Sequence, residues 1–213
     1  MFVDRLPAMS AREALLRELR AIVADQRVLD AIGRVPREYF VSGGDRRSAY
    51  ANRALPISCG QTISQPLVVA RMCELLELRE TDRVLEVGTG SGYHAAILAQ
   101  LARHVWTIET HADLSRGAAA ALDRAGIDNV TLIVGDGSVG LPDEAPFDAI
   151  CVTAAAPPDA LPPLEAQLAA GGRLVAPVAG EGEERLVRSR SEPSGVAREE
   201  LEPVRFVPLV RPD

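Results

Sequence analysis

A glycine-rich turn is the pattern in this sequence with the clearest chemical meaning: Gly88-Thr89-Gly90-Ser91-Gly92. Glycine adopts left-handed backbone dihedrals at little cost and lets a ligand come close to the main chain. The turn follows an apolar run at 84–87 and precedes a helical run at 93–102, which is the strand-turn-helix order of nucleotide-binding units. We therefore expect the cofactor-binding residues to include Gly88, Thr89, Gly90 and Gly92.

Acidic residues follow the next two predicted strands. Glu109 ends the run 105–108, about 20 residues after the first glycine, where an acidic side chain can accept hydrogen bonds from both hydroxyls of a ribose. Asp136 lies after the run 130–134, just before Gly137, and is placed to accept a hydrogen bond from an exocyclic amine such as adenine N6. As an alternative, Asp136 caps the chain at this turn. We expect Glu109, Asp136 and Gly137 to bind a nucleoside.

The glycine spacing indicates which nucleoside is bound. A dinucleotide site usually has the spacing G-x-G-x-x-G, with the pyrophosphate at the helix N-terminus, whereas here the third glycine comes one residue early. Glu86, just before the turn, would repel a pyrophosphate but suits an ammonium group. S-adenosylmethionine carries an ammonium, a sulfonium and a ribose, and it has no phosphate. The residues thus favour S-adenosylmethionine, with S-adenosylhomocysteine as its product, over the nicotinamide cofactor of a dehydrogenase.

The composition excludes several other chemistries. All 23 basic residues are Arg, so neither a Schiff-base lysine nor a P-loop lysine is available. A net charge of −7 disfavours a nucleic-acid partner. The three cysteines include no C-x-x-C pair and the three histidines no i, i+4 pair, so no metal site is expected. Short apolar runs, and an N-terminal stretch that mixes acids with Arg, predict a cytoplasmic protein with no membrane partner.

Alternating strands and helices are expected to position these residues. Helical spacing covers 11–34, with a break near Asp25, and returns at 66–78 after a long structured loop at 42–65. Beyond it, strands are predicted at 84–87, 105–108, 130–134, 147–152 and 173–178, helices at 93–102, 114–125 and 161–169, and two last strands at 185–189 and 204–210 around a turn at 193–195. This order predicts an α/β fold with a doubly wound, mostly parallel seven-stranded sheet and an antiparallel C-terminal end.

Further motifs lie on both sides of the glycine turn. The most particular ones are Q-T-I-S-Q-P at 61–66 and V-R-F-V-P-L at 204–209; the others are V-P-R-E-Y-F-V at 35–41, A-L-P-I at 54–57, G-D-G at 135–137, A-P-F-D at 145–148, T-A-A-A-P at 153–157, Q-L at 167–168 and G-G-R-L at 171–174. Together they resemble the protein-L-isoaspartate (D-aspartate) O-methyltransferase family over about residues 28–209. The resemblance implies a Rossmann-like class I S-adenosylmethionine-dependent methyltransferase fold.

The resemblance also implies an activity and its residues. The activity is methyl transfer from S-adenosylmethionine to the free α-carboxylate of L-isoaspartyl residues in damaged proteins or peptides, which leads through a succinimide to repair. Ser64 is implied as the catalytic residue, which donates a hydrogen bond to the substrate carboxylate, with substrate contacts from Thr62, Ile57 and Val207. A carboxylate is already ionised near neutral pH, so the reaction needs no general base. Ser64 could alternatively cap the helix that begins near Pro66.

A chain of 213 residues fits one hydrophobic core. Within it, residues 1–65 are expected to form an N-terminal helical extension with the substrate loop. Residues 66–213 are expected to form the S-adenosylmethionine-binding methyltransferase core, as one compact unit.

Two positions of the loop differ from the residues that are common in the family. Asn52 stands where aspartate is common, and Ser58 stands where glycine is common. Both lie in the segment expected to face the substrate, so they bear on substrate choice and leave cofactor binding intact. Two alternatives therefore stay open: a methyltransferase that acts on a specific aspartate of one dedicated modified peptide, and a catalytically weak S-adenosylmethionine-binding homologue.

Overall fold

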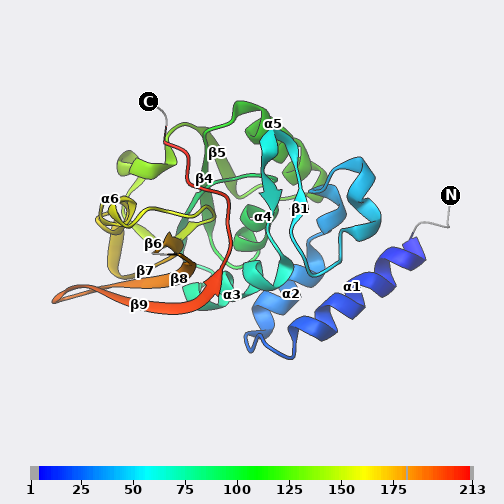
Figure 1. Cartoon of the computed structure of the whole chain (residues 1–213), viewed down its shortest axis with the longest axis horizontal. Coiled ribbons are helices and arrows are strands. Elements are labelled where there is room, and N and C mark those ends of the chain that lie inside the picture. The colour runs from blue at the N-terminus through cyan, green and yellow to red at the C-terminus, as the bar shows by residue number, and fades with distance from the viewer. Residues whose placement is uncertain (1–4, 181, 212–213) are drawn as a thin grey trace.

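A seven-stranded sheet runs through the molecule, whose computed structural model describes residues 5–180 and 182–211. The strand order is β5-β4-β3-β6-β7-β8-β9. The strands are β3 (Arg83–Val87), β4 (His104–Glu109), β5 (Val130–Val134), β6 (Phe147–Val152), β7 (Leu168–Ala179), β8 (Glu184–Glu192) and β9 (Gly195–Val204). The first five pair in parallel, and β8 and β9 are antiparallel (Figure 1). The predicted fold class is confirmed.

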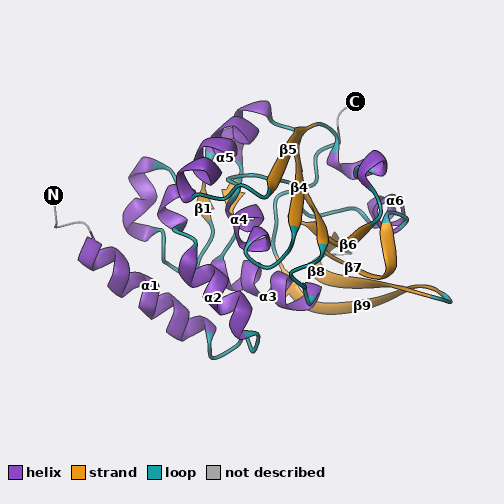
Figure 2. Ribbon diagram, turned by 180° about the vertical axis from the view of Figure 1, so that it is seen from behind, coloured by secondary structure: helices purple, strands orange, loops and turns teal. Residues whose placement is uncertain are grey.

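The sheet separates two apolar clusters. Successive residues of β6 alternate between them, because side chains of a strand point to opposite faces. Ala149 and Cys151 join the cluster that contains residues of α1 to α5, whereas Ile150 and Val152 join the cluster that contains residues of α6. The helices are α1 (Arg5–Leu19), α2 (Gln26–Arg34), α3 (Pro66–Leu76), α4 (Tyr93–Ala99), α5 (Ala112–Ala125) and α6 (Leu161–Glu165). Both faces of the sheet are therefore covered (Figure 2).

The N-terminal helices break where the sequence predicts it. Asp25 is the N-cap of α2, and its carboxylate accepts the backbone N–H of Arg27 at 2.9 Å. The loop at 42–65 contains the short antiparallel pair β1 (Leu55–Pro56) and β2 (Thr62–Ile63). Short 3-10 turns lie at Arg37–Tyr39, Gly43–Ser48, Ser58–Gly60, Gly137–Val139, Pro142–Glu144 and Pro158–Ala160. Residues of α1 and α2 share an apolar cluster with β3 and β4, and the domain boundary expected at residue 65 stays a prediction.

The helix predicted at 161–169 is wrong in its second half, because α6 ends at Glu165 and β7 begins at Leu168. The backbone carbonyl of Gln167 accepts the N–H of Phe147 at 2.9 Å, and Leu168 pairs with the same residue of β6. The N–H groups of Ala166 and Gln167 still bond to carbonyls of α6, and the sheet bonds begin at the carbonyl of Gln167. The prediction also missed the length of β7, which begins before Arg173.

The last strand predicted, at 204–210, is also wrong. The strand after the turn is β9, Gly195–Val204, which lies at the edge of the sheet. Its residues Arg198, Glu199 and Glu200 are exposed and charged, so the strand lacks an apolar pattern. Residues after Val204 form a C-terminal segment that leaves the edge of the sheet and crosses to the loop after β6.

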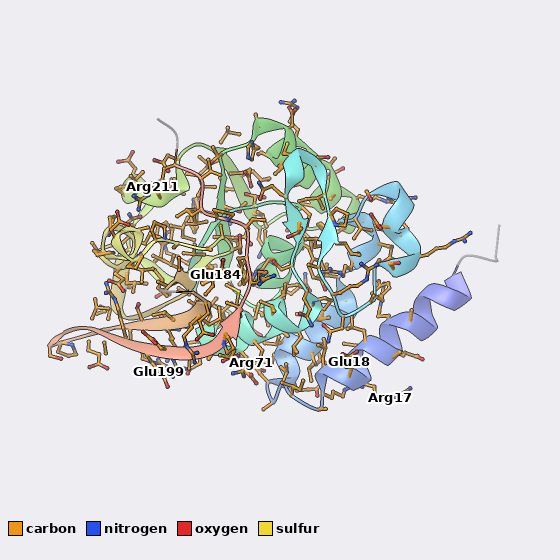
Figure 3. All side chains as sticks on the ribbon, viewed as in Figure 1. Arg17, Glu18, Arg71, Glu184, Glu199 and Arg211 are labelled. Carbon is orange, nitrogen blue, oxygen red and sulfur yellow. The ribbon has the colours of Figure 1, made fainter. Side chains whose placement is uncertain are left out.

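Three hydrogen bonds to its backbone hold the C-terminal segment in place. Glu184 of β8 accepts the N–H of Phe206 at 2.6 Å, and Figure 3 shows Glu184 beside the segment. Ala155 donates its N–H to Val207 O at 2.8 Å and accepts the N–H of Leu209 at 2.9 Å. The segment is thereby fixed over the carboxyl ends of the central strands. In the part of the chain that the structure describes, no helix has the length and apolar character needed to cross a membrane.

Candidate active site

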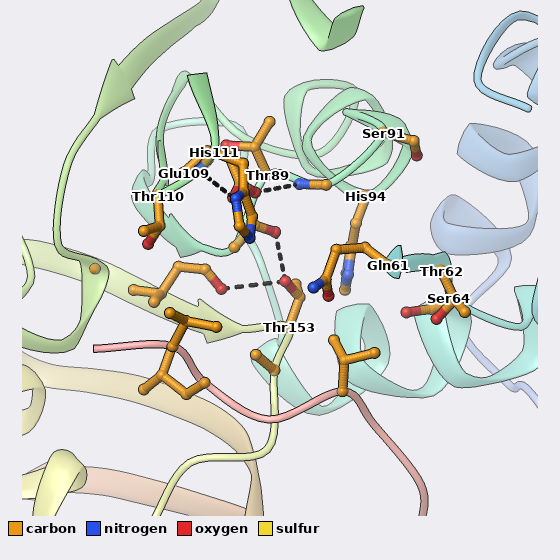
Figure 4. Close-up of a pocket in the computed structure, with 18 of the residues that line it drawn as sticks. Gln61, Thr62, Ser64, Thr89, Ser91, His94, Glu109, Thr110, His111 and Thr153 are labelled. Atoms are coloured by element: carbon orange, nitrogen blue, oxygen red, sulfur yellow. Dashed lines mark hydrogen bonds between the residues drawn. The ribbon is translucent and has the colours of Figure 1, made fainter. Parts of the chain in front are cut away.

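A cavity opens at the carboxyl ends of β3, β4 and β6, and we call it the strand-end cavity. Ligands of open parallel sheets bind where the strand connections change direction, and β3 is that point here because β4 flanks it on one side and β6 on the other. The lining comes from the turn after β3, the end of β4, the loop 61–64, the residues after β6 and the C-terminal segment at 207–210 (Figure 4).

The glycine turn forms one wall of this cavity. Gly88, Thr89 and Gly90 line it, and their contact with the cofactor stays a prediction. Gly88 has a φ of +97°, and a Cβ there would lie 2.5 Å from Thr153 Oγ1, so a larger residue would not fit. Gly92 lies outside the cavity lining. It is the N-cap of α4, and a Cβ on it would lie 3.0 Å from the Cβ of Ala118, so its position serves the close approach of α4 and α5.

Glu109 holds the glycine turn in place. Its Oε2 accepts the N–H of Gly90 at 2.8 Å, and its Oε1 accepts the N–H of His111 at 2.9 Å. The carboxylate is largely buried and lines the strand-end cavity. Each carboxylate oxygen has a second lone pair, so Glu109 can accept ribose hydroxyls while it keeps both backbone bonds. Glu109 therefore ends β4 beside the glycine turn, and its contact with a ribose stays a prediction.

Glu86 lies behind the turn and not on the cavity surface. Its side chain is fully buried, and its Oε2 accepts the Thr107 hydroxyl at 2.5 Å, while Oε1 has no partner among the described residues. The Thr107 hydroxyl is in turn 2.6 Å from that of Thr89. Burial raises the pKa of Glu86 to about 8. The sequence predicts contact between Glu86 and an ammonium group. The buried position of Glu86, outside the lining of the cavity, does not offer that contact.

Asp136 and Gly137 differ in where they lie. Gly137 lines the strand-end cavity, and a Cβ there would be 2.7 Å from the Val87 side chain. Asp136 is not in the lining; its Oδ1 accepts the N–H of Ser138 at 2.8 Å, which is the capping role weighed as the alternative. The second oxygen of Asp136 can still accept a hydrogen bond. Its contact with an adenine amine therefore stays a prediction.

The loop that carries Thr62 and Ser64 is anchored between them. Ile63 is buried and pairs with Leu55, so its two neighbours face the cavity instead of the core. Ser64 is not the cap of α3: the cap bond comes from Asn52, whose Oδ1 accepts the N–H of Leu67 at 3.1 Å. The Ser64 hydroxyl therefore remains available to a ligand.

A second depression, which we call the side groove, adjoins the strand-end cavity. Its lining is Ala54, Thr62, Ser64, Gln65, Val68, Thr153 and residues 203–207. Four residues line both spaces: Thr62, Ser64, Thr153 and Val207. They mark the junction at which a ligand in the cavity and a ligand in the groove would meet. Ile57 is in neither lining, although its Cδ1 would lie 3.7 Å from a Cβ on Gly90.

Sequence reasoning missed several lining residues, among them Gln61, His94, Thr110, His111 and Thr153. The signal for Thr153 was available, because it directly follows β6 at the same sheet edge as the glycine turn. His94 is nearly buried, and its Nε2 lies 3.3 Å from Cys73 Sγ and 3.7 Å from Cys151 Sγ. Burial lowers the pKa of His94 to about 4, so the ring is neutral near pH 7.

The charges around the strand-end cavity suit a ligand without phosphates. None of its lining residues is Arg, and Glu109 contributes a carboxylate, so a pyrophosphate would meet no guanidinium group there. The close-approach glycines, the ribose acceptor and the absence of Arg from this lining fit S-adenosylmethionine. Among the described residues, no group of three or more His, Cys, Asp or Glu could hold a metal ion.

Nearly the whole chain is similar to one group of enzymes. Residues 10–213 match the family model described as protein-L-isoaspartate(D-aspartate) O-methyltransferase. The protein-L-isoaspartate O-methyltransferase of Parvibaculum lavamentivorans is 52% identical over 202 residues, 93% of this chain and 90% of that protein. A solved protein-L-isoaspartate O-methyltransferase has a TM-score of 0.83 at 26% identity, over 92% of this chain and 65% of that one. A Plasmodium falciparum protein-L-isoaspartate O-methyltransferase, solved with S-adenosyl-L-homocysteine, has a TM-score of 0.79 at 27% identity, over 95% of this chain and 98% of that one.

Proposed function

The chain belongs to the protein-L-isoaspartate(D-aspartate) O-methyltransferase family, and we propose that it methylates the free α-carboxylate of L-isoaspartyl residues at the junction of the strand-end cavity and the side groove. The observation that carries the proposal is the set of four residues shared by the two linings, which includes Ser64 and Thr153. The strand-end cavity would hold S-adenosylmethionine, and the side groove would hold the damaged protein or peptide.

The chemistry needs little from the protein beyond position. S-adenosylmethionine supplies a methyl group activated by its sulfonium: a carboxylate oxygen forms the new C–O bond while the C–S bond breaks and its electron pair stays on sulfur. No proton moves, because the carboxylate is ionised near neutral pH. Alignment of the reacting groups can lower the barrier by about 7–11 kcal/mol. The absence of lysine from the chain therefore costs this reaction nothing.

Ser64 would orient the substrate carboxylate. Its hydroxyl faces the junction, and its only hydrogen can be donated to a carboxylate oxygen. Thr62, two residues earlier on the same face of the loop, offers a second hydroxyl. Because Asn52 caps α3, Ser64 need not divide its hydrogen bonding between the helix and the substrate.

Glu109 would hold the ribose, with the turn at Gly88, Thr89 and Gly90 against the rest of the cofactor. Both Glu109 oxygens already bind backbone N–H groups, so the acceptor is in place before the ligand arrives. Such preorganisation lowers the entropy cost of binding.

The substrate would lie extended between the loop at 54–65 and residues 203–207, which span the end of β9 and the start of the C-terminal segment. Part of that segment's backbone is already bonded, through Phe206 N–H to Glu184 and Val207 O to Ala155, so the segment is a fixed wall of the groove. After methylation, the following backbone amide nitrogen attacks the ester, methanol leaves, and a succinimide forms. Addition of water then gives aspartate or isoaspartate, which completes the repair cycle.

The direct assay uses tritiated S-adenosylmethionine and two matched peptides, one isoaspartyl and one normal aspartyl. We expect base-labile methyl ester on the isoaspartyl peptide only. Equal incorporation into both peptides, or none into either, would contradict the proposal.

We also infer a reducing, cytoplasmic location, supported by the free thiols of Cys59, Cys73 and Cys151.

A further inference from the structure

Thr153 is one of the four residues of the junction. It follows the last residue of β6, and its backbone N–H donates to Val87 O at 2.9 Å, which ties it to the end of β3. Its side chain is partly exposed and lines both the strand-end cavity and the side groove. Figure 4 shows Thr153 between the glycine turn and the loop that carries Thr62 and Ser64.

The hydrogen of the Thr153 hydroxyl is already committed. Thr153 Oγ1 lies 2.5 Å from Gly88 O and 3.1 Å from Val87 O. Both partners are backbone carbonyls, which accept hydrogen bonds and cannot donate them, so the single hydroxyl hydrogen points toward the end of β3. The oxygen can offer a ligand only its lone pairs. Thr153 is therefore an acceptor at a point where Ser64 is available as a donor.

An acceptor at this junction discriminates between the two reacting groups. A substrate carboxylate offers only lone pairs, so an oxygen that cannot donate would repel it. A methyl group on a sulfonium is different, because the positive charge polarises its C–H bonds and makes them weak hydrogen-bond donors. The glycine at position 88 permits this arrangement, since a Cβ there would lie 2.5 Å from Thr153 Oγ1 and would displace it.

We propose that Thr153 Oγ1 accepts C–H hydrogen bonds from the activated methyl group, and so holds that methyl toward the side groove. The inference rests on the proposed function for the identity of the methyl donor. It assigns one residue to each reacting group: Ser64 donates to the carboxylate, and Thr153 accepts from the methyl group. Together the two contacts align the carboxylate oxygen with the methyl carbon and the sulfur. Thr153 is thus a catalytic residue. The carbonyl of Gly88 in the glycine turn accepts its hydroxyl hydrogen, and this leaves the lone pairs of Oγ1 for the methyl group.

The test compares two ligands that differ in the methyl group. S-adenosylmethionine has the sulfonium methyl, and S-adenosylhomocysteine lacks it. We expect Thr153→Ala to weaken S-adenosylmethionine binding about 3- to 10-fold more than S-adenosylhomocysteine binding in isothermal titration calorimetry. Thr153→Ser keeps the hydroxyl and should keep the wild-type ratio of the two dissociation constants. Thr110→Ala, which removes a cavity hydroxyl that does not line the groove, should also keep that ratio.

Other outcomes overturn the inference. If Thr153→Ala left the ratio of the two dissociation constants unchanged, Thr153 would not contact the methyl group. Equal weakening of both ligands, with unchanged binding of methylthioadenosine, would place the contact at the ammonium group instead. Equal weakening of all three would mean that Thr153 only supports the glycine turn. These binding ratios need no peptide substrate, so a wild-type protein that fails to methylate isoaspartyl peptide would count against the proposed function and leave this test intact.

Discussion

The side-chain amide of Asn52 donates to the carboxylate of Glu18 in α1, with a distance of 2.6 Å between Nδ2 and Oε1. The other end of the same amide, Oδ1, accepts the N–H of Leu67 and caps α3. One residue therefore joins the first helix to the helix that follows Ser64. An aspartate, common at this position in the family, could cap α3 but would put a second carboxylate against Glu18.

Asn52 should matter for stability through this cap. We expect Asn52→Ala to lower the free energy of unfolding by about 1 kcal/mol, with a Tm lower by about 2–4 °C. Asn52→Asp keeps an acceptor for the Leu67 N–H and should lose less, because the exposed Glu18 can turn away. Differential scanning calorimetry at pH 7 measures both. An Asp variant as unstable as the Ala variant would show that the contact with Glu18, and not the cap, dominates.

Ser64→Ala should slow methyl transfer without affecting the cofactor. Loss of a hydrogen bond to a charged group predicts a kcat/KM for isoaspartyl peptide about 10- to 100-fold lower. The dissociation constant of S-adenosylhomocysteine should stay at the wild-type value, since Ser64 faces the junction and not the ribose end. Parallel losses of activity and of S-adenosylhomocysteine affinity would mean that Ser64 has a structural role only.

Glu109→Ala should weaken cofactor binding first. The change removes the proposed ribose acceptor and also frees the N–H groups of Gly90 and His111. We expect the dissociation constant of S-adenosylhomocysteine to rise by at least about 10-fold. Asp113→Ala, which removes an exposed carboxylate at the start of the next helix, is the matched control and should leave that constant unchanged. Similar effects of the two substitutions would point to net charge instead of the specific contact.

Glu86 should make stability depend on pH. Its pKa in the folded protein is raised to about 8 by burial, above the ordinary value near 4.5 that holds in the unfolded chain. The unfolded state therefore releases this proton at lower pH, and the free energy of unfolding should fall as pH rises from about 4.5 to about 8. Glu86→Gln cannot ionise, so its stability relative to wild type should improve steadily across that range. Urea melts at several pH values measure the difference, and parallel curves for the two proteins would show that Glu86 does not titrate in this way.

The features that could be predicted from the sequence are those encoded by residues that are close together in the chain. The strand before Gly88, the glycine turn and the helix after it are contiguous, so their periodicity and dihedral needs are visible in one short stretch. Glu109 was found because parallel strands bring their carboxyl ends to one edge. By contrast, β9 carries charge on its exposed edge, so nothing in its pattern distinguished it from a loop.

Roles set by distant partners could not be predicted in the same way. The acceptor character of Thr153 depends on Gly88 O and Val87 O, which lie far away in the chain. Glu86 was expected to contact an ammonium group, but its depth behind Thr89 and Thr107 is a property of the packed sheet that its place in the sequence does not show. The end of α6 was misplaced because only the pairing of Leu168 with Phe147 decides where the sheet begins.

The most direct measurement is a crystal structure of the protein with S-adenosylhomocysteine and an isoaspartyl peptide. We predict that the α-carboxylate of the isoaspartyl residue lies within hydrogen-bond distance of Ser64 Oγ, and that the sulfur of the bound S-adenosylhomocysteine faces it across Thr153. The peptide should follow the side groove along residues 203–207. A carboxylate bound away from the four shared residues, or a sulfur that points away from the side groove, would contradict the account.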